Sequence, residues 1–260
     1  MSRVRGLTRR LAYILILPLV TAGVLVGIHS LDRGSGRSGN TVIQHQASNA
    51  AARSSCRRSN ALIGTVAGAM VQARAAPTRH SPVLASFART NVEGNQQVFL
   101  LVGQAIAQGR TWFRALLPVR PNGTMGFIPG SSLTLAKTPY RLTVSKEQRR
   151  LTLWNGCRRM RTYPVGIGTK DTPTPVGTFY LASLLKPPVS DSVYGVYAYG
   201  LSGYSPVIHN WKWGGVIGLH GTNEPSSVGH YTSHGCIRMY NRDIEQLVRI
   251  LPLGTPITIS

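Results

Sequence analysis

The chain has 260 residues and a formal net charge of +21, from 29 Lys and Arg against 8 Asp and Glu. A charge of this size favours polyanionic partners. The basic residues are dispersed and match no nucleic-acid-binding motif, so the sequence argues against nucleic acid and favours an anionic wall polymer or membrane surface.

The first feature in chain order is Leu11–Ile28, an uncharged and mostly apolar run of 18 residues with four arginines before it. Positive charge on the N-terminal side of such a run places the rest of the chain outside the cytoplasm. We therefore expect residues 1–30 to be an uncleaved signal anchor, with a cleaved signal peptide as the alternative. Either reading predicts the extracytoplasmic cell envelope, with the chain anchored in the cytoplasmic membrane or secreted.

Residues 31–79 are rich in Ser, Ala, Arg, Gly and Asn and contain no aromatic side chain. Segments of this composition bury too little apolar surface to fold alone. We expect a flexible basic linker, within which Ala61–Ala76 is a candidate small-residue helix that Gly64 and Gly68 weaken.

Residues 80–136 contain short apolar clusters separated by turn signals, which predicts four to six short strands in a small barrel. The turn signals are Glu93-Gly94-Asn95, Gln108-Gly109 and Pro121-Asn122-Gly123. The run Trp112–Pro129 resembles a bacterial SH3-like module, and this resemblance implies wall binding. A rigid spacer packed against the domain that follows is the alternative.

Beyond residue 138 the sequence predicts further strands and one helix. Apolar residues alternate with polar ones at Leu142, Val144, Leu151 and Leu153, as in half-buried strands. The helix is expected at Asn241–Leu251, with Asn241 as N-cap and acidic residues in the first turn. Its apolar stripe consists of Ile244, Leu247, Val248 and Leu251.

The three cysteines, an odd number, argue against a disulfide framework. Cys56 lies in the predicted linker and Cys157 in a predicted strand or turn, and a bridge between these two stays open. Cys236 has a different setting, because a polar, glycine-rich sequence surrounds it. That setting is typical of a reactive thiol rather than of a buried one.

The stretch from His220 to Met239 carries the chemistry of the chain. A cysteine attacks carbonyls as the thiolate, and a free thiol is mostly protonated at neutral pH. His220, at the end of the apolar run Val216–Leu219, is the candidate base for Cys236. Gly235 permits a tight turn with backbone N–H groups facing the reacting carbon. These are the parts of a thiol acyl-transfer site.

This stretch closely resembles the catalytic signature of the L,D-transpeptidases, the YkuD family. The matching residues are His220-Gly221-Thr222, Gly229 and the unbroken run Ser233–Met239. The resemblance extends over about residues 138–260. It implies a mainly β chain in which the SH3-like barrel precedes a β-sandwich-like catalytic domain with one short C-terminal helix.

The resemblance also implies the reaction. Cys236 would attack a peptide stem of peptidoglycan and form a thioester acyl-enzyme, with His220 as base and no metal or cofactor. An amine of a second stem would then accept the acyl group and form a cross-link. An L,D-carboxypeptidase that uses water as acceptor, or a catalytically silent wall-binding protein, are the alternatives.

The remaining site residues are assigned from the same resemblance. Ser233, His234 and Gly235 are expected to shape the pocket, with oxyanion donors on the backbone around Gly235 and Cys236; His234 is also an alternative base. Arg238 and Thr222 are candidate substrate-binding residues. For Arg238 an ion pair with Asp243 or Glu245 is the alternative.

Two other site classes fit the sequence less well. A zinc cluster would use His209, His220, His230, His234 and Cys236, but their spacings match none of the usual short ligand pairs. In a papain-like peptidase the cysteine comes before the histidine, and here that order is reversed.

Overall fold

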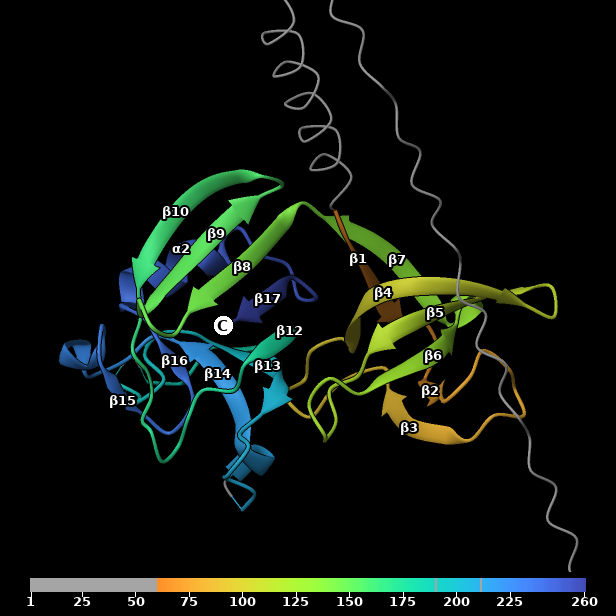
Figure 1. The fold of residues 1–260 in the computed structure, drawn as a ribbon, viewed down its shortest axis with the longest axis horizontal. Coiled ribbons are helices and arrows are strands. Elements are labelled where there is room, and N and C mark those ends of the chain that lie inside the picture. The colour runs from red at the N-terminus through yellow and green to blue at the C-terminus, as the bar shows by residue number, and fades with distance from the viewer. Residues whose placement is uncertain (1–59, 190, 211) are drawn as a thin grey trace, which may run out of the picture. The chain divides into compact units, whose positions relative to one another are not determined.

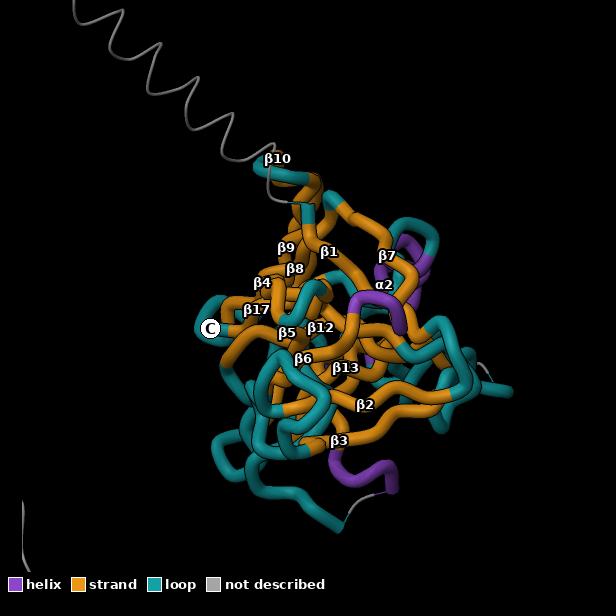
Figure 2. The backbone as a smooth tube through the Cα atoms, turned by 90° about the vertical axis from the view of Figure 1, so that its right-hand side faces the viewer, coloured by secondary structure: helices purple, strands orange, loops and turns teal. Residues whose placement is uncertain are grey.

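The computed structural model describes residues 60–189, 191–210 and 212–260. Over these residues the protein is mainly β, as predicted, and contains one α-helix, α2 (Asn241–Val248). The strands form sheets of seven, eight and two strands (Figure 1). Figure 2 shows how strands dominate the backbone, with α2 as a short separate element.

The predicted anchor at residues 1–30 and the N-terminal part of the linker lie outside the described residues. Within the described ranges, every helix is too short or too polar to cross a membrane.

The seven-stranded sheet is antiparallel throughout, in the order β3-β2-β6-β5-β4-β1-β7. The three turns predicted between residues 80 and 136 lie where expected, and Gly94, Gly109 and Gly123 all have positive φ. The assignment as an SH3-like barrel stays a prediction. The strands are β1 (Ala61–Val66), β2 (Met70–Arg74), β3 (Val83–Ala88), β4 (Val98–Ala107), β5 (Arg110–Leu116), β6 (Met125–Pro129) and β7 (Leu133–Thr138), with a 3-10 helix at Gly130–Ser132.

The prediction was wrong for residues 61–76, which were assigned to the linker with a candidate helix. They form β1 and β2. Small residues here serve close packing between strands: a Cβ on Gly64 would lie 2.9 Å from the Leu133 side chain. A glycine at such a position reads as a helix breaker in the sequence, although it marks a crowded strand.

The eight-stranded sheet has the order β10-β9-β8-β17-β12-β13-β14-β16 and is mixed. Its parallel pairs are β17 with β8 and β14 with β16. The strands are β8 (Tyr140–Ser145), β9 (Arg150–Asn155), β10 (Arg158–Pro164), β12 (Gly177–Leu185), β13 (Ala198–Tyr204), β14 (Val216–His220), β16 (Ile237–Arg238) and β17 (Pro256–Ile259). The two-stranded sheet pairs β11 (Ile167–Gly168) with β15 (Tyr231–Ser233), and 3-10 helices occupy Lys212–Gly215 and Pro225–Ser227.

The two large sheets share a hydrophobic core. In the first half of β4, successive side chains point to opposite faces, and both faces are buried. Phe99 and Leu101 pack into the core of the seven-stranded sheet. Val98 and Leu100 pack instead with Tyr180 of β12. The hydroxyl of Tyr180, which is fully buried, donates a hydrogen bond of 3.1 Å to the carbonyl of Val98.

The β5–β6 loop adds polar contacts to this shared core. The Arg120 guanidinium donates to the carbonyls of Ser205, Ile208 and Gly214 at 2.8–3.0 Å. The Asn122 amide both donates to and accepts from the backbone of Tyr204. The seven-stranded sheet is therefore packed against the domain that follows it, and its role as a wall-binding module or as a rigid spacer stays a prediction.

Helix α2 carries the predicted apolar stripe at Ile244, Leu247 and Val248, but it ends at Val248 instead of the predicted Leu251, and the predicted cap was wrong. Ile244 and Leu247 are fully buried. The N-cap residue is Tyr240, with no side-chain cap bond. The side chain of Asn241 instead accepts a hydrogen bond of 2.9 Å from the backbone N–H of Thr222. A residue that looked like a local cap thus holds the segment that follows β14.

The cysteines differ in state. Cys236 is the free thiol among the described residues. Cys157 lies in the turn between β9 and β10 and is disulfide-bonded. Cys56, the other residue of the predicted open pair, lies outside the described residues.

Candidate active site

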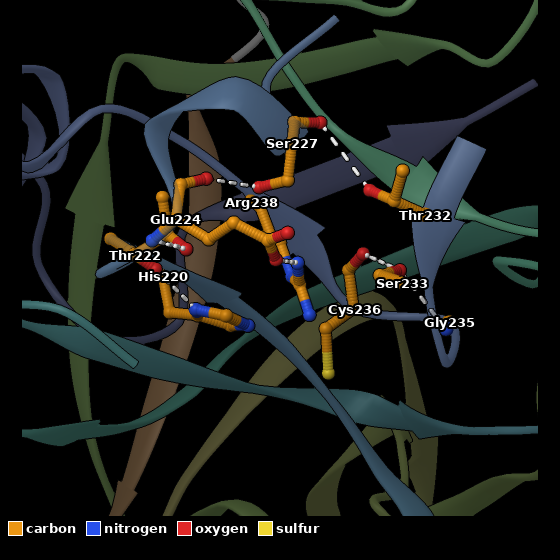
Figure 3. Close-up of polar contacts among 10 residues, drawn as sticks. His220, Thr222, Glu224, Ser227, Thr232, Ser233, Gly235, Cys236 and Arg238 are labelled. Carbon is orange, nitrogen blue, oxygen red and sulfur yellow. Dashed lines mark hydrogen bonds and ion pairs between the residues drawn. The ribbon is translucent and has the colours of Figure 1, made fainter. Parts of the chain in front are cut away.

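Strand pairing brings the predicted nucleophile and base together. β14 ends at His220, and β16 begins immediately after Cys236. The two strands pair in parallel, with Leu219 opposite Ile237 and His220 opposite Arg238. Both strands belong to the eight-stranded sheet, so the sheet carries His220 directly and fixes the end of the turn that carries Cys236. In Figure 3 the His220 imidazole extends from the end of β14 toward the region where the Cys236 sulfur lies.

Gly218 touches both reactive groups, and sequence reasoning did not single it out. Its backbone N–H donates to the Cys236 sulfur at 3.3 Å. A Cβ on Gly218 would lie 3.1 Å from His220 Cδ2 and 3.6 Å from Cys236 Sγ. The signal was a glycine inside the apolar run Val216–Leu219, because such glycines often mark a close approach.

The hydrogen bond of His220 selects its tautomer. Nδ1 lies within hydrogen-bond distance of the carbonyl of Gly221. A carbonyl only accepts, so Nδ1 carries the proton and Nε2 of the neutral ring carries the lone pair. The ring also packs edge-on against Tyr194, with centroids 5.2 Å apart. Burial lowers the pKa of His220 to about 4, opposed by the bond to Gly221 and assisted by nearby Arg238.

The Cys236 thiol is protonated at neutral pH rather than present as a thiolate. Burial raises the pKa of Cys236, while the N–H of Gly218 and the charge of Arg238 pull that pKa down. A thiol with a raised pKa beside a histidine with a lowered pKa is a neutral pair at neutral pH. In such a pair a thiolate would have to form by loss of the thiol proton, and Nε2 of His220 is the candidate acceptor because it holds a free lone pair.

Ser233 holds the turn that presents Cys236. Its hydroxyl donates to the carbonyl of Cys236 at 2.6 Å and accepts from the N–H of Gly235 at 3.1 Å. Gly235 has φ of +112°, a conformation that side chains disfavour. Since the N–H of Gly235 donates to Ser233, the N–H of Cys236 is the remaining candidate for the oxyanion donor predicted on this turn.

The other predicted pocket residues divide between wall and support. His234 is exposed and, with Ser233 and Arg238, lines the cavity in front of Cys236. Thr222 is buried, and its hydroxyl accepts a hydrogen bond from the N–H of Glu224. Its observed contacts are therefore those of a support for the loop after β14.

Arg238 forms an ion pair, but with a partner that the sequence did not predict. Its guanidinium lies 2.8 Å from the Glu224 carboxylate (Figure 3). The predicted partners Asp243 and Glu245 were wrong, and Asp243 instead lies 3.9 Å from Arg242. Glu224 lies in the loop that Thr222 supports, which folds back toward β16. Contact between that loop and β16 is a tertiary feature, whereas Asp243 and Glu245 were chosen for their nearness in sequence.

A cavity of about 410 Å³ opens over the reactive pair. Its lining includes residues of strands β13 and β14, together with Tyr194 and Leu185. Val92 and Glu93, from the β3–β4 loop of the seven-stranded sheet, complete the wall. The N-terminal sheet is thus part of the site, which sequence reasoning missed. Among the residues that the structure describes, no three His, Cys, Asp or Glu side chains gather as a metal site.

Comparison with known proteins identifies what this arrangement is similar to. Residues 139–259 match the model of the YkuD L,D-transpeptidase catalytic domain. The YkuD protein of Bacillus subtilis (strain 168), whose name places it with the L,D-transpeptidases, is 36% identical over 152 residues, which cover 56% of this chain and 85% of that protein. Its Bacillus licheniformis counterpart is 35% identical over 161 residues, covering 59% and 90%.

A solved L,D-transpeptidase from Mycobacterium tuberculosis H37Rv is 16% identical, covers 63% of this chain and 90% of that one, and gives a TM-score of 0.41. At that TM-score the structural match adds nothing to the sequence matches.

Proposed function

Because the chain belongs to the YkuD family of L,D-transpeptidases, we propose that it cross-links peptide stems of peptidoglycan through a thioester on Cys236. The observation that carries this proposal is that the free Cys236 thiol and His220, whose Nε2 holds the free lone pair, line the same cavity. An intact pair of this kind supports an enzyme rather than a silent wall-binding protein.

In the first half-reaction, the Cys236 sulfur attacks a carbonyl carbon of the donor stem and forms a C–S bond. The thiol proton passes to Nε2 of His220, and the oxyanion is met by the N–H of Cys236. The C–N bond then breaks, and His220 returns the proton to the departing amine. The thioester conserves the acyl group without any external energy source.

In the second half-reaction, an amine of another stem attacks the thioester carbonyl. The new C–N bond forms, the C–S bond breaks, and the proton lost by the amine returns through His220 to sulfur. Water in place of the amine would give an L,D-carboxypeptidase, so the product mixture separates these two activities.

Replacing Cys236 with Ala is the direct test. The variant should fold and lose all acyl-enzyme formation. We expect intact-protein mass spectrometry to show a carbapenem adduct on the unsubstituted full chain, located in the peptide that contains Cys236, and no adduct on Cys236→Ala. An unchanged adduct on Cys236→Ala would disprove the role of this thiol. Products from tetrapeptide stems, identified by mass, then distinguish cross-linking from hydrolysis.

We also propose that the catalytic domain works outside the cytoplasm, held by residues 1–30. Support comes from the apolar run Leu11–Ile28 with arginines before it, and from the location of the substrate. A reporter fused after Ser260 that requires an extracytoplasmic location should be active. High salt should leave an anchored chain in the membrane fraction and release a charge-bound one. Soluble cytoplasmic protein would contradict the proposal.

A further inference from the structure

One carboxylate in the cavity wall is unexplained by the chemistry above. The chain between residues 60 and 138 has seven Lys and Arg and a single acidic residue, Glu93. That residue lies in the wall of the cavity that contains Cys236 and His220. Among the described residues of this wall, Glu93 is the only carboxylate, and the other ionisable groups there, apart from Tyr194, Tyr199 and Cys236, are His220, His234 and Arg238.

The loop that carries Glu93 is held in place from within. The side-chain oxygen of Asn91 accepts from the N–H groups of Glu93 and Asn95 at 3.2 and 2.9 Å. The N–H of Gly94, a residue with φ of +81°, donates to the carbonyl of Asn91 at 3.0 Å. A turn with this many internal bonds presents its side chains in a fixed direction.

The same loop is fastened to the catalytic domain. The N–H of Leu184 donates to the side chain of Asn95 at 2.7 Å, and the amide of Asn91 donates to the carbonyl of Ala182 at 3.4 Å. Both partners lie in β12. Preorganised charges recognise ligands well because little ordering is needed on binding.

The two side chains of opposite charge in the cavity wall, Arg238 and Glu93, differ in their surroundings. Arg238 already has a partner in Glu224, whereas Glu93 is half-buried and faces the cavity beside the apolar side chain of Val92. A carboxylate in such a position favours a cationic group of the ligand. The proposed reaction has one cationic reactant, since an amine acceptor is mostly an ammonium ion at neutral pH.

We propose that Glu93 is a specificity-determining residue that binds the ammonium group of the acyl acceptor, and this inference rests on the proposed function. The acceptor arrives as R–NH3⁺ at Glu93 and releases one proton to water. The neutral amine attacks the thioester carbonyl, the C–N bond forms and the C–S bond breaks. The second proton passes through His220 to the Cys236 sulfur. The N-terminal sheet is therefore the acceptor side of the site.

The test compares a cationic with an uncharged acceptor on the full chain. Acyl-enzyme is offered Nα-acetyl-lysine amide, which carries an ammonium group, or hydroxylamine, which is uncharged at neutral pH. In Glu93→Gln we expect KM for the lysine acceptor to rise about fivefold to tenfold. KM for hydroxylamine and the rate of acylation by the donor should stay within about twofold.

Matched variants make the result specific. Glu147→Gln removes an exposed carboxylate in the turn between β8 and β9 and should leave both KM values unchanged. Glu93→Asp should recover part of the lysine-acceptor KM. Equal KM values for Glu93→Gln and the unsubstituted chain, or an equal rise for both acceptors, would overturn the inference while leaving the transpeptidase function intact. Failure of the unsubstituted chain to acylate would overturn both.

Discussion

At the scale of single residues, the candidate site contains two groups, His220 and Cys236, whose pKa shifts both favour the neutral form over an imidazolium–thiolate ion pair. Burial lowers the pKa of His220 and raises that of Cys236. Arg238 favours the thiolate and disfavours the imidazolium, so it eases loss of the thiol proton while keeping the base neutral. In the reaction that we propose, the thiol proton is therefore transferred during attack, and no imidazolium–thiolate resting state is needed.

His220→Ala should therefore lower the rate of acylation by about 10²–10⁴, the usual contribution of general acid–base catalysis. The rate is measured by stopped-flow fluorescence or mass spectrometry with a carbapenem. His234→Ala is the control, because His234 lines the cavity but is exposed. A near-normal His220→Ala together with an inactive His234→Ala would exchange their roles.

The same histidine predicts how stability depends on pH. The folded-state pKa of about 4 lies below the ordinary value of 6.5, so the unfolded chain takes up the proton first as pH falls. The contribution is complete above about pH 6.5 and is lost as pH falls toward 4, by about 3 kcal/mol at most. Urea unfolding at a series of pH values should show this loss, and His220→Gln should lack that part of it.

A His220→Gln profile that matches the unsubstituted profile between pH 6.5 and 4 would contradict this account. The remaining acid sensitivity, which comes from groups shared by the two proteins, serves as the internal reference.

At the scale of elements, the Ser233–Cys236 turn orients the candidate nucleophile. β14 and β16 place the two chain segments, but the direction of the Cys236 side chain depends on the turn before it. Two bonds of Ser233 and the positive φ of Gly235 hold that turn. Backbone held in this way at a reactive residue is a common site of stored strain.

Gly235→Ala should lower acylation at least tenfold, because a Cβ at φ of +112° would also lie 3.1 Å from Ile217. Gly229→Ala is the matched control. Gly229 also has positive φ, +92°, but no atom lies within 4 Å of the position that a Cβ would take there. Both variants should lose about 1 kcal/mol of unfolding free energy from strain, and only Gly235→Ala should lose the rate. Equal rate losses in the two variants would show that the turn has no special role.

At the scale of the whole described chain, two β sheets make one functional unit. Tyr180 and β4 share a core, Asn122 and Arg120 fasten the β5–β6 loop to β13 and to the segment that follows it, and the β3–β4 loop completes the cavity wall. Disturbing the shared core should therefore change both stability and activity, although the core contains neither Cys236 nor His220.

Tyr180→Phe should reduce the free energy of unfolding by about 1 kcal/mol, because it removes a buried hydrogen bond to the carbonyl of Val98 and leaves the amide of Gln97 as the side-chain donor to that carbonyl. Tyr231→Phe is the matched control, since Tyr231 is half exposed and its hydroxyl donates to the carbonyl of Lys146. That variant should stay within about 0.5 kcal/mol. Chemical denaturation measures both, and a larger loss for Tyr231→Phe would contradict the shared core.

The family motif, the turns and the C-terminal helix could be predicted from the sequence alone, because each depends on residues that are close together in the chain. The run Ser233–Met239 with His220 upstream predicted the family, which the comparisons confirm, and the candidate nucleophile and base, while glycines at Gly94, Gly109 and Gly123 marked turns that the structure confirms. Turn conformation and strand periodicity depend on neighbours in the chain, so residue patterns report them directly. The helix near the C-terminus was predicted for the same reason.

Only the tertiary structure decided which distant groups meet. Pairing of β14 with β16 places Gly218 against Cys236, folding of the loop after β14 gives Arg238 its partner Glu224, and packing of β4 on Tyr180 brings Glu93 to the cavity. Each contact joins segments far apart in sequence, and their side chains carry no local sign of the partner. Strands β1 and β2 were missed because small residues selected for crowded packing resemble those of a linker.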